Sequence, residues 1–126
     1  MTRPSSVRRS KPLILCVEDD RNQLWLLQRI LEGNGFAVIG AANAAEALEI
    51  FHHTPVTLVI SDHLLGGKTG AELAEEIKAI QPTVPIVLRS GCAPESLANI
   101  DAFILKGEPV KDFLQMISSL VQRAAS

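Results

Sequence analysis

The sequence contains no tyrosine, only two cysteines among its 126 residues, and no apolar run long enough to cross a bilayer. The last of these absences argues against membrane insertion. The stretch LILCV is also too short for a secretory signal and leads directly into acidic residues. Cys16 and Cys92 lie far apart, which favours reduced thiols in a cytoplasmic protein over a disulfide. Repeats, low-complexity segments and internal linkers are absent too, so we expect one domain.

Acidic residues are missing from the first twelve positions, which carry four of the twelve lysines and arginines. The remainder, 13–126, has eight basic and fourteen acidic residues and therefore a net charge of −6. An acidic body argues against nucleic-acid binding. Residues 1–12 show no periodic apolar face, and their composition favours a basic, disordered N-terminal arm.

Short apolar segments alternate with amphipathic ones along the rest of the chain. The expected strands cover 12–17, 36–40, 56–61, 84–90 and 101–105. The expected helices begin near Arg21, Asn43, Thr69 and Val110, and the second and third carry a glutamate at the capping-box spacing. Because the strands are apolar throughout, the pattern predicts an α/β fold in which an open, doubly wound, five-stranded parallel sheet is covered on both faces.

The fourth crossover is unusually short. Only ten residues, GCAPESLANI, separate Ser90 from Asp101, which is at the lower limit for joining parallel strands. Pro94 suits a first helical position, so about five residues are left for a helix of little more than one turn. We therefore expect the fourth helix to be a stub or an irregular loop.

Reactive side chains end or follow four of the five expected strands. They are Glu18, Asp19, Asp20, Asp62, Ser90 and Lys106. Ligands of such sheets gather outside the carboxyl ends of the strands. Clustered carboxylates repel one another unless a cation is present, and Mg²⁺ prefers oxygen ligands of this kind. With Mg²⁺ and the lysine, the pocket would accept a phosphoryl group in transfer to an oxygen nucleophile.

This constellation resembles the receiver domains of bacterial two-component response regulators (CheY-like, with a flavodoxin-like three-layer fold) over residues 13–124. ILCVEDD is similar to the family's first strand and acidic pair. SDHLLGGKTGAELAEEI is similar to its phosphoacceptor segment, with Gly70 at the start of the following helix. PIVLRSG and AFILK match the segments with the hydroxyl and the lysine. The resemblance implies Asp62 as phosphoacceptor; Glu18, Asp19, Asp62 and the Leu64 carbonyl as Mg²⁺ ligands; Lys106 and Ser90 as phosphoryl-binding residues; and Ser90 and Phe103 as switch residues.

The resemblance also implies a function. A histidine kinase or histidine phosphotransfer protein would phosphorylate Asp62, and the resulting switch would alter a surface that binds a downstream protein target. The chain would catalyse only its own phosphorylation and dephosphorylation, and would not be an enzyme for another substrate. Without tyrosine, the switch at Phe103 would act by packing alone. No output domain is expected after the last helix, so the receiver would work as a stand-alone protein unless the sequence is a fragment of a longer chain.

Two departures from the family pattern matter. Lys106 is followed by Gly107 where the family usually has proline, and a non-proline cis peptide costs about 2.5–4 kcal/mol. The short fourth crossover would reshape a face that the family uses for dimers and targets, and would leave Ile100 and Phe103 less covered than usual. Partners would then use the first helix or the loops around the site.

Other interpretations remain open. Asp19 or Asp20 would serve as a helix cap, Asp62 and Ser90 would suit turns, and Lys106 would suit a solvated position. A flavodoxin-like cofactor binder needs a phosphate loop where this chain has the acidic EDDRNQ, and an aspartate-nucleophile phosphatase typically has a second acid where this chain has Leu64. The strongest alternative is a pseudo-receiver, an interaction module independent of phosphorylation, but it predicts the loss of a site residue and none is lost.

Overall fold

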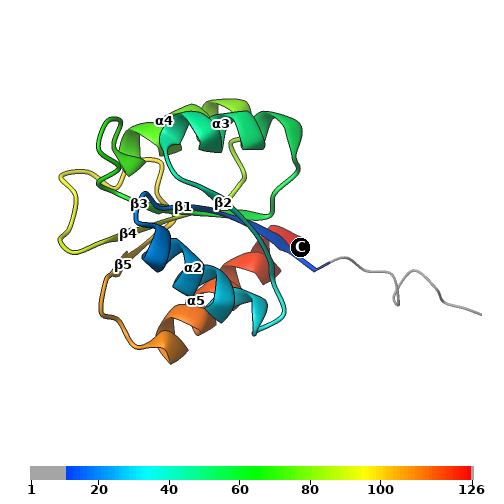
Figure 1. Ribbon diagram of the computed structural model, residues 1–126. Helices are drawn as coiled ribbons and strands as arrows, with labels where there is room; N and C mark the ends of the chain where they lie inside the picture. The colour runs from blue at the N-terminus through cyan, green and yellow to red at the C-terminus, as the bar shows by residue number, and fades with distance from the viewer. Residues whose placement is uncertain (1–10, 126) are drawn as a thin grey trace, which may run out of the picture.

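The computed structural model describes residues 11–125 and contains five strands and four helices in that range (Figure 1). In chain order the elements are β1 (Leu13–Val17), α2 (Arg21–Glu32), β2 (Ala37–Ala41), α3 (Ala44–His53), β3 (Leu58–Asp62), α4 (Gly70–Ile80), β4 (Ile86–Ser90), β5 (Ala102–Leu105) and α5 (Val110–Ala125). Each strand begins one or two residues later than the sequence predicted. Most of the predicted basic arm, residues 1–10, lies outside the described residues.

The strands form one parallel sheet in the order β2-β1-β3-β4-β5, which confirms the predicted open, doubly wound architecture. Helices α3 and α4 cover one face of the sheet, and α2 and α5 cover the other (Figure 1). Alternate residues of the buried strands supply both cores, because successive side chains of a strand point to opposite faces. Within residues 11–125, no helix combines the length and apolar character that a membrane span requires.

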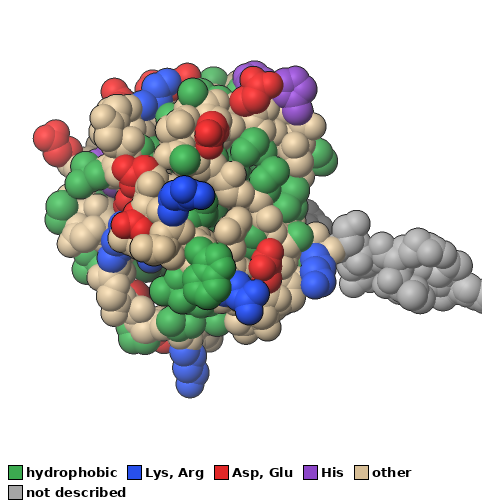
Figure 2. Space-filling model, in the orientation of Figure 1, with side chains coloured by type: hydrophobic (Ala, Val, Ile, Leu, Met, Phe, Trp, Pro, Cys, Tyr) green, Lys and Arg blue, Asp and Glu red, His purple; other side chains and the backbone are tan. Residues whose placement is uncertain are grey.

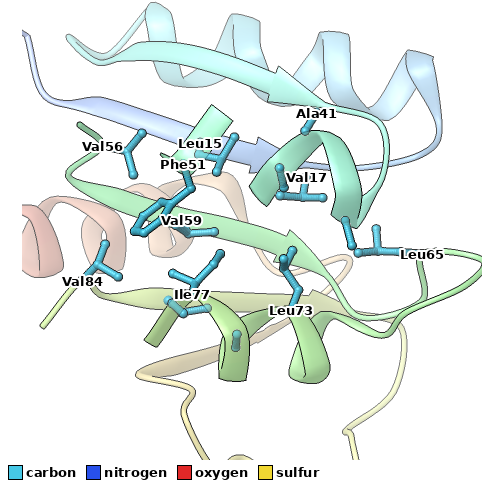
Figure 3. Packing of buried hydrophobic residues seen from close by; sticks show 14 residues of the cluster. Leu15, Val17, Ala41, Phe51, Val56, Val59, Leu65, Leu73, Ile77 and Val84 are labelled. Carbon is cyan, nitrogen blue, oxygen red and sulfur yellow. The ribbon is translucent and has the colours of Figure 1, made fainter. Parts of the chain in front are cut away.

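The two faces hold separate hydrophobic clusters. On the α3/α4 face, Val17 and Val59 pack with Phe51, Leu73 and Ile77 (Figure 3). On the α2/α5 face, strand residues pack against both helices. They are Cys16, Ile60 and Val87 from the sheet, Leu27 and Leu31 from α2, and Phe113 and Ile117 from α5. These clusters fix the position of each strand along its own axis, and therefore the positions of the residues at the carboxyl edge.

Side chains cap the helices that begin at this edge. The Asp20 carboxylate accepts hydrogen bonds from the backbone N–H groups of Asn22 (2.9 Å) and Gln23 (3.0 Å), so Asp20 is the cap of α2. Thr69 and Glu72 form the predicted capping box of α4. At α3, Asn43 caps the helix as expected, but the Glu46 carboxylate accepts from the N–H of Ala42 and not from that of Asn43.

The β4–β5 crossover contains no helix. Residues 91–101 form turns and irregular backbone, which confirms the prediction from its length. Asp101 closes the segment, because its Oδ2 accepts from the N–H of Ile86 (2.7 Å) and from Lys78 Nζ (2.8 Å). Ile100 packs against the α3/α4 cluster and is only partly buried, as is Phe103.

Candidate functional site

The register of the sheet places acidic and basic residues in one row at its carboxyl edge. Cys16 lies beside Ile60, which lies beside Val87, all facing α2 and α5. Two positions further along each strand are Glu18, Asp62 and Arg89, and Asp62 and Arg89 are direct register partners. Because alternate residues of a strand share a face, these side chains project to the α2/α5 side of the edge. Lys106 follows β5 at the same edge, where its backbone N–H donates to the Ser90 carbonyl at 2.8 Å.

Asp62 is only 7% exposed, and the structure brings Lys106 into contact with it. Its Oδ2 accepts from Lys106 Nζ at 3.1 Å, and its Oδ1 accepts from the His63 N–H at 3.1 Å. Lys106 Nζ also donates to Gln23 Oε1 at 3.1 Å. Lys106 is therefore held in the site by two hydrogen bonds and is not a solvated surface residue.

Glu18 is the most buried acid at the edge, with 2% of its surface exposed. Its Oε2 accepts from the Asp20 N–H at 3.2 Å, whereas its buried Oε1 accepts no hydrogen bond from any residue within 11–125. Lys106 Nζ and Arg89 Nη1 lie 3.6 Å and 3.9 Å from that oxygen. Burial raises the pKa of Glu18, and the charge of Asp62 acts in the same direction; the Asp20 N–H and the two cations oppose the rise.

Glu18, Asp19 and Asp62 fit a divalent cation. One carboxylate oxygen of each lies within 4.8 Å of the others, and Asp19 is exposed. Glu18 Oε1, a buried acceptor without a donor, is the kind of atom that a metal ion satisfies. Three hard oxygen donors at an open edge match the coordination preferences of Mg²⁺. Asp20 is engaged in capping α2, and the hydrocarbon side chain of Leu64 has no ligand atom, so Leu64 can offer only its backbone carbonyl.

Ser90 ends β4 at the same edge, whereas Phe103 lies inside β5 as the register partner of Leu88. Ser90 is buried, and its Oγ accepts from the Cys92 N–H at a long 3.5 Å. Alternation along β4 turns the serine to the opposite side of the strand from Arg89, and as the last residue of β4 it still lies at the carboxyl edge. No hydrogen bond joins Ser90 to Asp62 among the described residues.

Gly70 allows the start of α4 to pack closely against the end of β3. Its N–H donates to the His63 carbonyl at 2.7 Å. A Cβ at this position would lie 2.4 Å from the Asp62 carbonyl oxygen and 2.6 Å from Leu88 Cδ1. Only glycine allows this approach, which explains the glycine that the sequence places at the start of α4.

The peptide bond after Lys106 is trans, as are all those of residues 11–125. Gly107 has a φ of +100°, in the region that favours glycine. The departure from Lys-Pro therefore gives this loop a backbone conformation that proline, whose φ is fixed near −65°, cannot adopt.

Two residues of the site were missed by sequence analysis. Gln23 binds Lys106 from α2 across 83 positions of sequence, and no local pattern indicates this contact. Arg89 lies beside Glu18, with its guanidinium 5.9 Å from the centre of the Phe113 ring. A signal for Arg89 was available, because it is the only basic residue within the five strands.

Comparisons with known proteins identify relatives of this fold and sequence. The family model of the response regulator receiver domain matches residues 14–117. The transcriptional regulatory protein GlrR of Escherichia coli is 30% identical over 118 residues, which cover 89% of this chain and 27% of GlrR. The C4-dicarboxylate transport transcriptional regulatory protein DctD of Rhizobium meliloti is 35% identical over 80 residues, 64% of this chain and 17% of DctD. The chain thus spans about a quarter or less of the length of these curated relatives.

Solved structures of response regulators are also similar to this chain. A response regulator receiver domain protein (CheY-like) from Methanospirillum hungatei has a TM-score of 0.84 at 30% identity, covering 92% of this chain and 98% of its own. The response regulator TrrA from Thermotoga maritima, solved in complex with Mg²⁺-BeF, has a TM-score of 0.82 at 27% identity, covering 86% of this chain and 98% of its own.

Proposed function

Because the chain belongs to the response regulator receiver domain family, we propose that Asp62 accepts a phosphoryl group from a phosphohistidine on a histidine kinase or histidine phosphotransfer protein. The observation that carries the proposal is the environment of Asp62. It is a buried carboxylate at the end of β3, bonded to Lys106 Nζ at 3.1 Å and grouped with Glu18 and Asp19.

The transfer is an in-line displacement at phosphorus. A carboxylate oxygen of Asp62 forms the new P–O bond while the P–N bond to the donor histidine breaks, and the bonding electron pair stays on the imidazole nitrogen. Lys106 is positioned to follow the oxygens of the phosphoryl group, because its Nζ already contacts the nucleophile. Magnesium, when bound, supplies positive charge that offsets the negative charge of the transferred group. Glu18, Asp19, Asp62 and the Leu64 carbonyl would hold it.

The phosphorylated state would be read at Ser90 and Phe103. The bond between Ser90 Oγ and the Cys92 N–H is 3.5 Å long, so little is lost when the hydroxyl turns to a phosphoryl oxygen. Phe103 is half-buried next to the helix-free crossover, and its movement would change the surface that a downstream protein target meets. We place this chemistry in the cytoplasm, on the argument from the cysteines, and limit it to the chain's own Asp62.

A groove beside Lys106 fits the phosphodonor protein. It has a volume of about 360 Å³ and runs between α2 and the start of α5. Its apolar walls include Leu26, Leu105 and Val110, which are roughly half exposed. Figure 2 shows hydrophobic side chains gathered over α2 on this face. We propose that a helix of the donor protein packs here and brings its phosphohistidine to Asp62.

Acetyl phosphate with Mg²⁺ tests the phosphoacceptor directly. Intact-mass measurement should show one added phosphoryl group on the wild type and on Asp20→Asn, in which asparagine still caps α2, and none on Asp62→Asn. Labelling of Asp62→Asn would overturn the assignment. If the wild type is neither labelled nor able to bind beryllofluoride, the phosphorylation-independent interaction module is the better description.

The donor surface needs a separate test. Leu26→Asp should slow transfer from a phosphohistidine protein while leaving labelling by acetyl phosphate unchanged. Ile80→Asp on α4 is the matched control, because Ile80 is similarly exposed (44% against 54%) and lies on the opposite face of the sheet. Equal effects of the two substitutions would place the donor elsewhere.

A further inference from the structure

Arg89 is a charged residue that neither the metal site nor the proposed phosphoacceptor explains. It stands inside β4, in a sheet whose strands are otherwise almost entirely apolar. Its side chain is only 20% exposed, because it lies between the edge of the sheet and Phe113 of α5. Burying a guanidinium is costly unless it is paired, so this position requires a compensating interaction.

The partner that compensates Arg89 is also a candidate metal ligand. Arg89 Nη1 lies 3.9 Å from Glu18 Oε1, the buried oxygen that accepts no hydrogen bond. That distance is an electrostatic contact without a hydrogen bond, so the guanidinium is attracted to the oxygen and not fixed by it. The guanidinium carbon lies 5.9 Å from the centre of the Phe113 ring, a cation–π contact that leaves the N–H groups in the guanidinium plane available. Among the described residues no hydrogen bond engages these N–H groups, so they can donate to another anion at the same edge.

Asp62 presents that anion once it is phosphorylated. Arg89 and Asp62 are register partners on neighbouring strands, whose backbones lie about 4.8 Å apart. Both side chains project to the α2/α5 side, where Lys106 also contacts Asp62. A phosphoryl group on Asp62 would extend beyond the edge into reach of a side chain as long as arginine, which binds phosphate oxygens in a fork.

We propose that Arg89 is a second phosphoryl-binding cation of the site, beside Lys106, which weakens Mg²⁺ binding before phosphorylation and stabilises the phosphoryl group afterwards by contacting its oxygens. The proposal rests on Asp62 as phosphoacceptor. Its first half follows from charge alone. Glu18, Asp19 and Asp62 carry three negative charges, which Lys106 and Arg89 reduce to one, so each cation opposes a further divalent ion. Its second half follows from the opposite sign of charge, because the phosphoryl group places negative oxygens next to the guanidinium, which attracts them.

Arg89→Met tests both halves, since methionine keeps an apolar stem against Phe113 and removes the charge. Calorimetric titration with Mg²⁺ should show binding about three- to thirtyfold tighter than in the wild type, an order of magnitude set by one unit charge at this range. Beryllofluoride binding at saturating Mg²⁺ should be weaker by a similar factor. Arg89→Lys keeps the positive charge, so its affinities for Mg²⁺ and beryllofluoride should both be close to those of the wild type. Lys111→Met, which removes one exposed charge from α5, should change neither.

A purely structural role for Arg89 makes a different prediction. Losing it would then disorder Glu18, and the affinities for Mg²⁺ and beryllofluoride would fall together. Unchanged or weaker Mg²⁺ binding in folded Arg89→Met overturns the proposal, as does unchanged beryllofluoride binding. Thermal unfolding in EDTA checks that the variant folds; if it does not, Arg89→Gln and Arg89→Lys carry the same test. Failure of the wild type to bind beryllofluoride would refute the phosphoacceptor, while the Mg²⁺ titration would still decide the first half.

Discussion

Gly70→Ala tests whether close packing between α4 and β3 holds the site together. The added Cβ would lie 2.4 Å from the Asp62 carbonyl oxygen and 3.0 Å from the His63 Cα. Both are backbone atoms, so no side-chain rotation relieves the contact. Overpacking of this kind costs about 1–3 kcal/mol, and weakening the Gly70–His63 hydrogen bond adds about 0.5–1.5 kcal/mol. Alanine regains at most about 1 kcal/mol of helix propensity at this position. We expect a net destabilisation of about 1–3 kcal/mol.

Urea unfolding followed by circular dichroism measures this difference. Gly67→Ala is the matched control, because Gly67 lies in the same loop and its Cβ would meet nothing within 4 Å. We expect the control to remain within about 0.5 kcal/mol of the wild type. Because Gly70 packs against the backbone of Asp62, the proposed nucleophile, Gly70→Ala should also slow labelling by acetyl phosphate. If both alanine variants have the same unfolding midpoint, the close approach does not constrain the site.

Three further predictions concern the charged edge and the thiols. Asp19→Ala should weaken Mg²⁺ binding at least tenfold in a calorimetric titration, while the metal-free protein stays as stable or becomes more stable, because carboxylate repulsion is relieved. Since burial raises the pKa of Glu18 above its ordinary value of 4.5, the folded protein keeps a proton that the unfolded chain has lost. The stability that this proton gives is complete below that pH and is lost as the pH rises through the folded pKa. Unfolding in EDTA across the acidic range should show this decline in the wild type and much less of it in Glu18→Gln. A thiol reagent at pH 8 should modify exposed Cys92 in the folded protein and spare Cys16 until urea unfolds it, because burial raises the pKa of Cys16 to about 12. Fast reaction of two thiols per folded molecule would show that the strand carrying Cys16 opens.

The fold could be predicted because its signals are local and repeated. Uniformly apolar strands separated by amphipathic helices require a sheet covered on both faces, and a ten-residue connection leaves too little chain for a regular helix. The acids at the edge followed from the same logic, because strand ends that are parallel meet. Arg89 was missed because the sequence analysis considered only the last residue of a strand and those that follow it, whereas the residue before the last also reaches the edge with a long side chain.

Contacts between side chains were less accessible from sequence. Gln23 meets Lys106 only because α2 and β5 lie at the same end of the sheet, and neither residue type indicates the other. The sequence left open whether Asp19 or Asp20 caps α2, since either residue suits a helix cap. In the structure the cap is Asp20, because its carboxylate reaches the first backbone N–H groups of the helix. Such choices depend on rotamers and local geometry that a residue pattern does not encode.

The helix-free crossover has a practical consequence for protein engineering. Its ends are fastened independently of its middle, by the Lys106–Ser90 backbone hydrogen bond at one end and by Asp101 at the other. Residues 91–99 between them are almost all exposed and contain no helical hydrogen bonds that an insertion would interrupt. Doubling the length of a flexible loop costs only about 0.6 kcal/mol of closure entropy. The segment is therefore a natural place to graft a peptide epitope or a fluorescent tag, because it shares a pocket with His63 and Leu64, the two residues that follow the proposed phosphoacceptor Asp62.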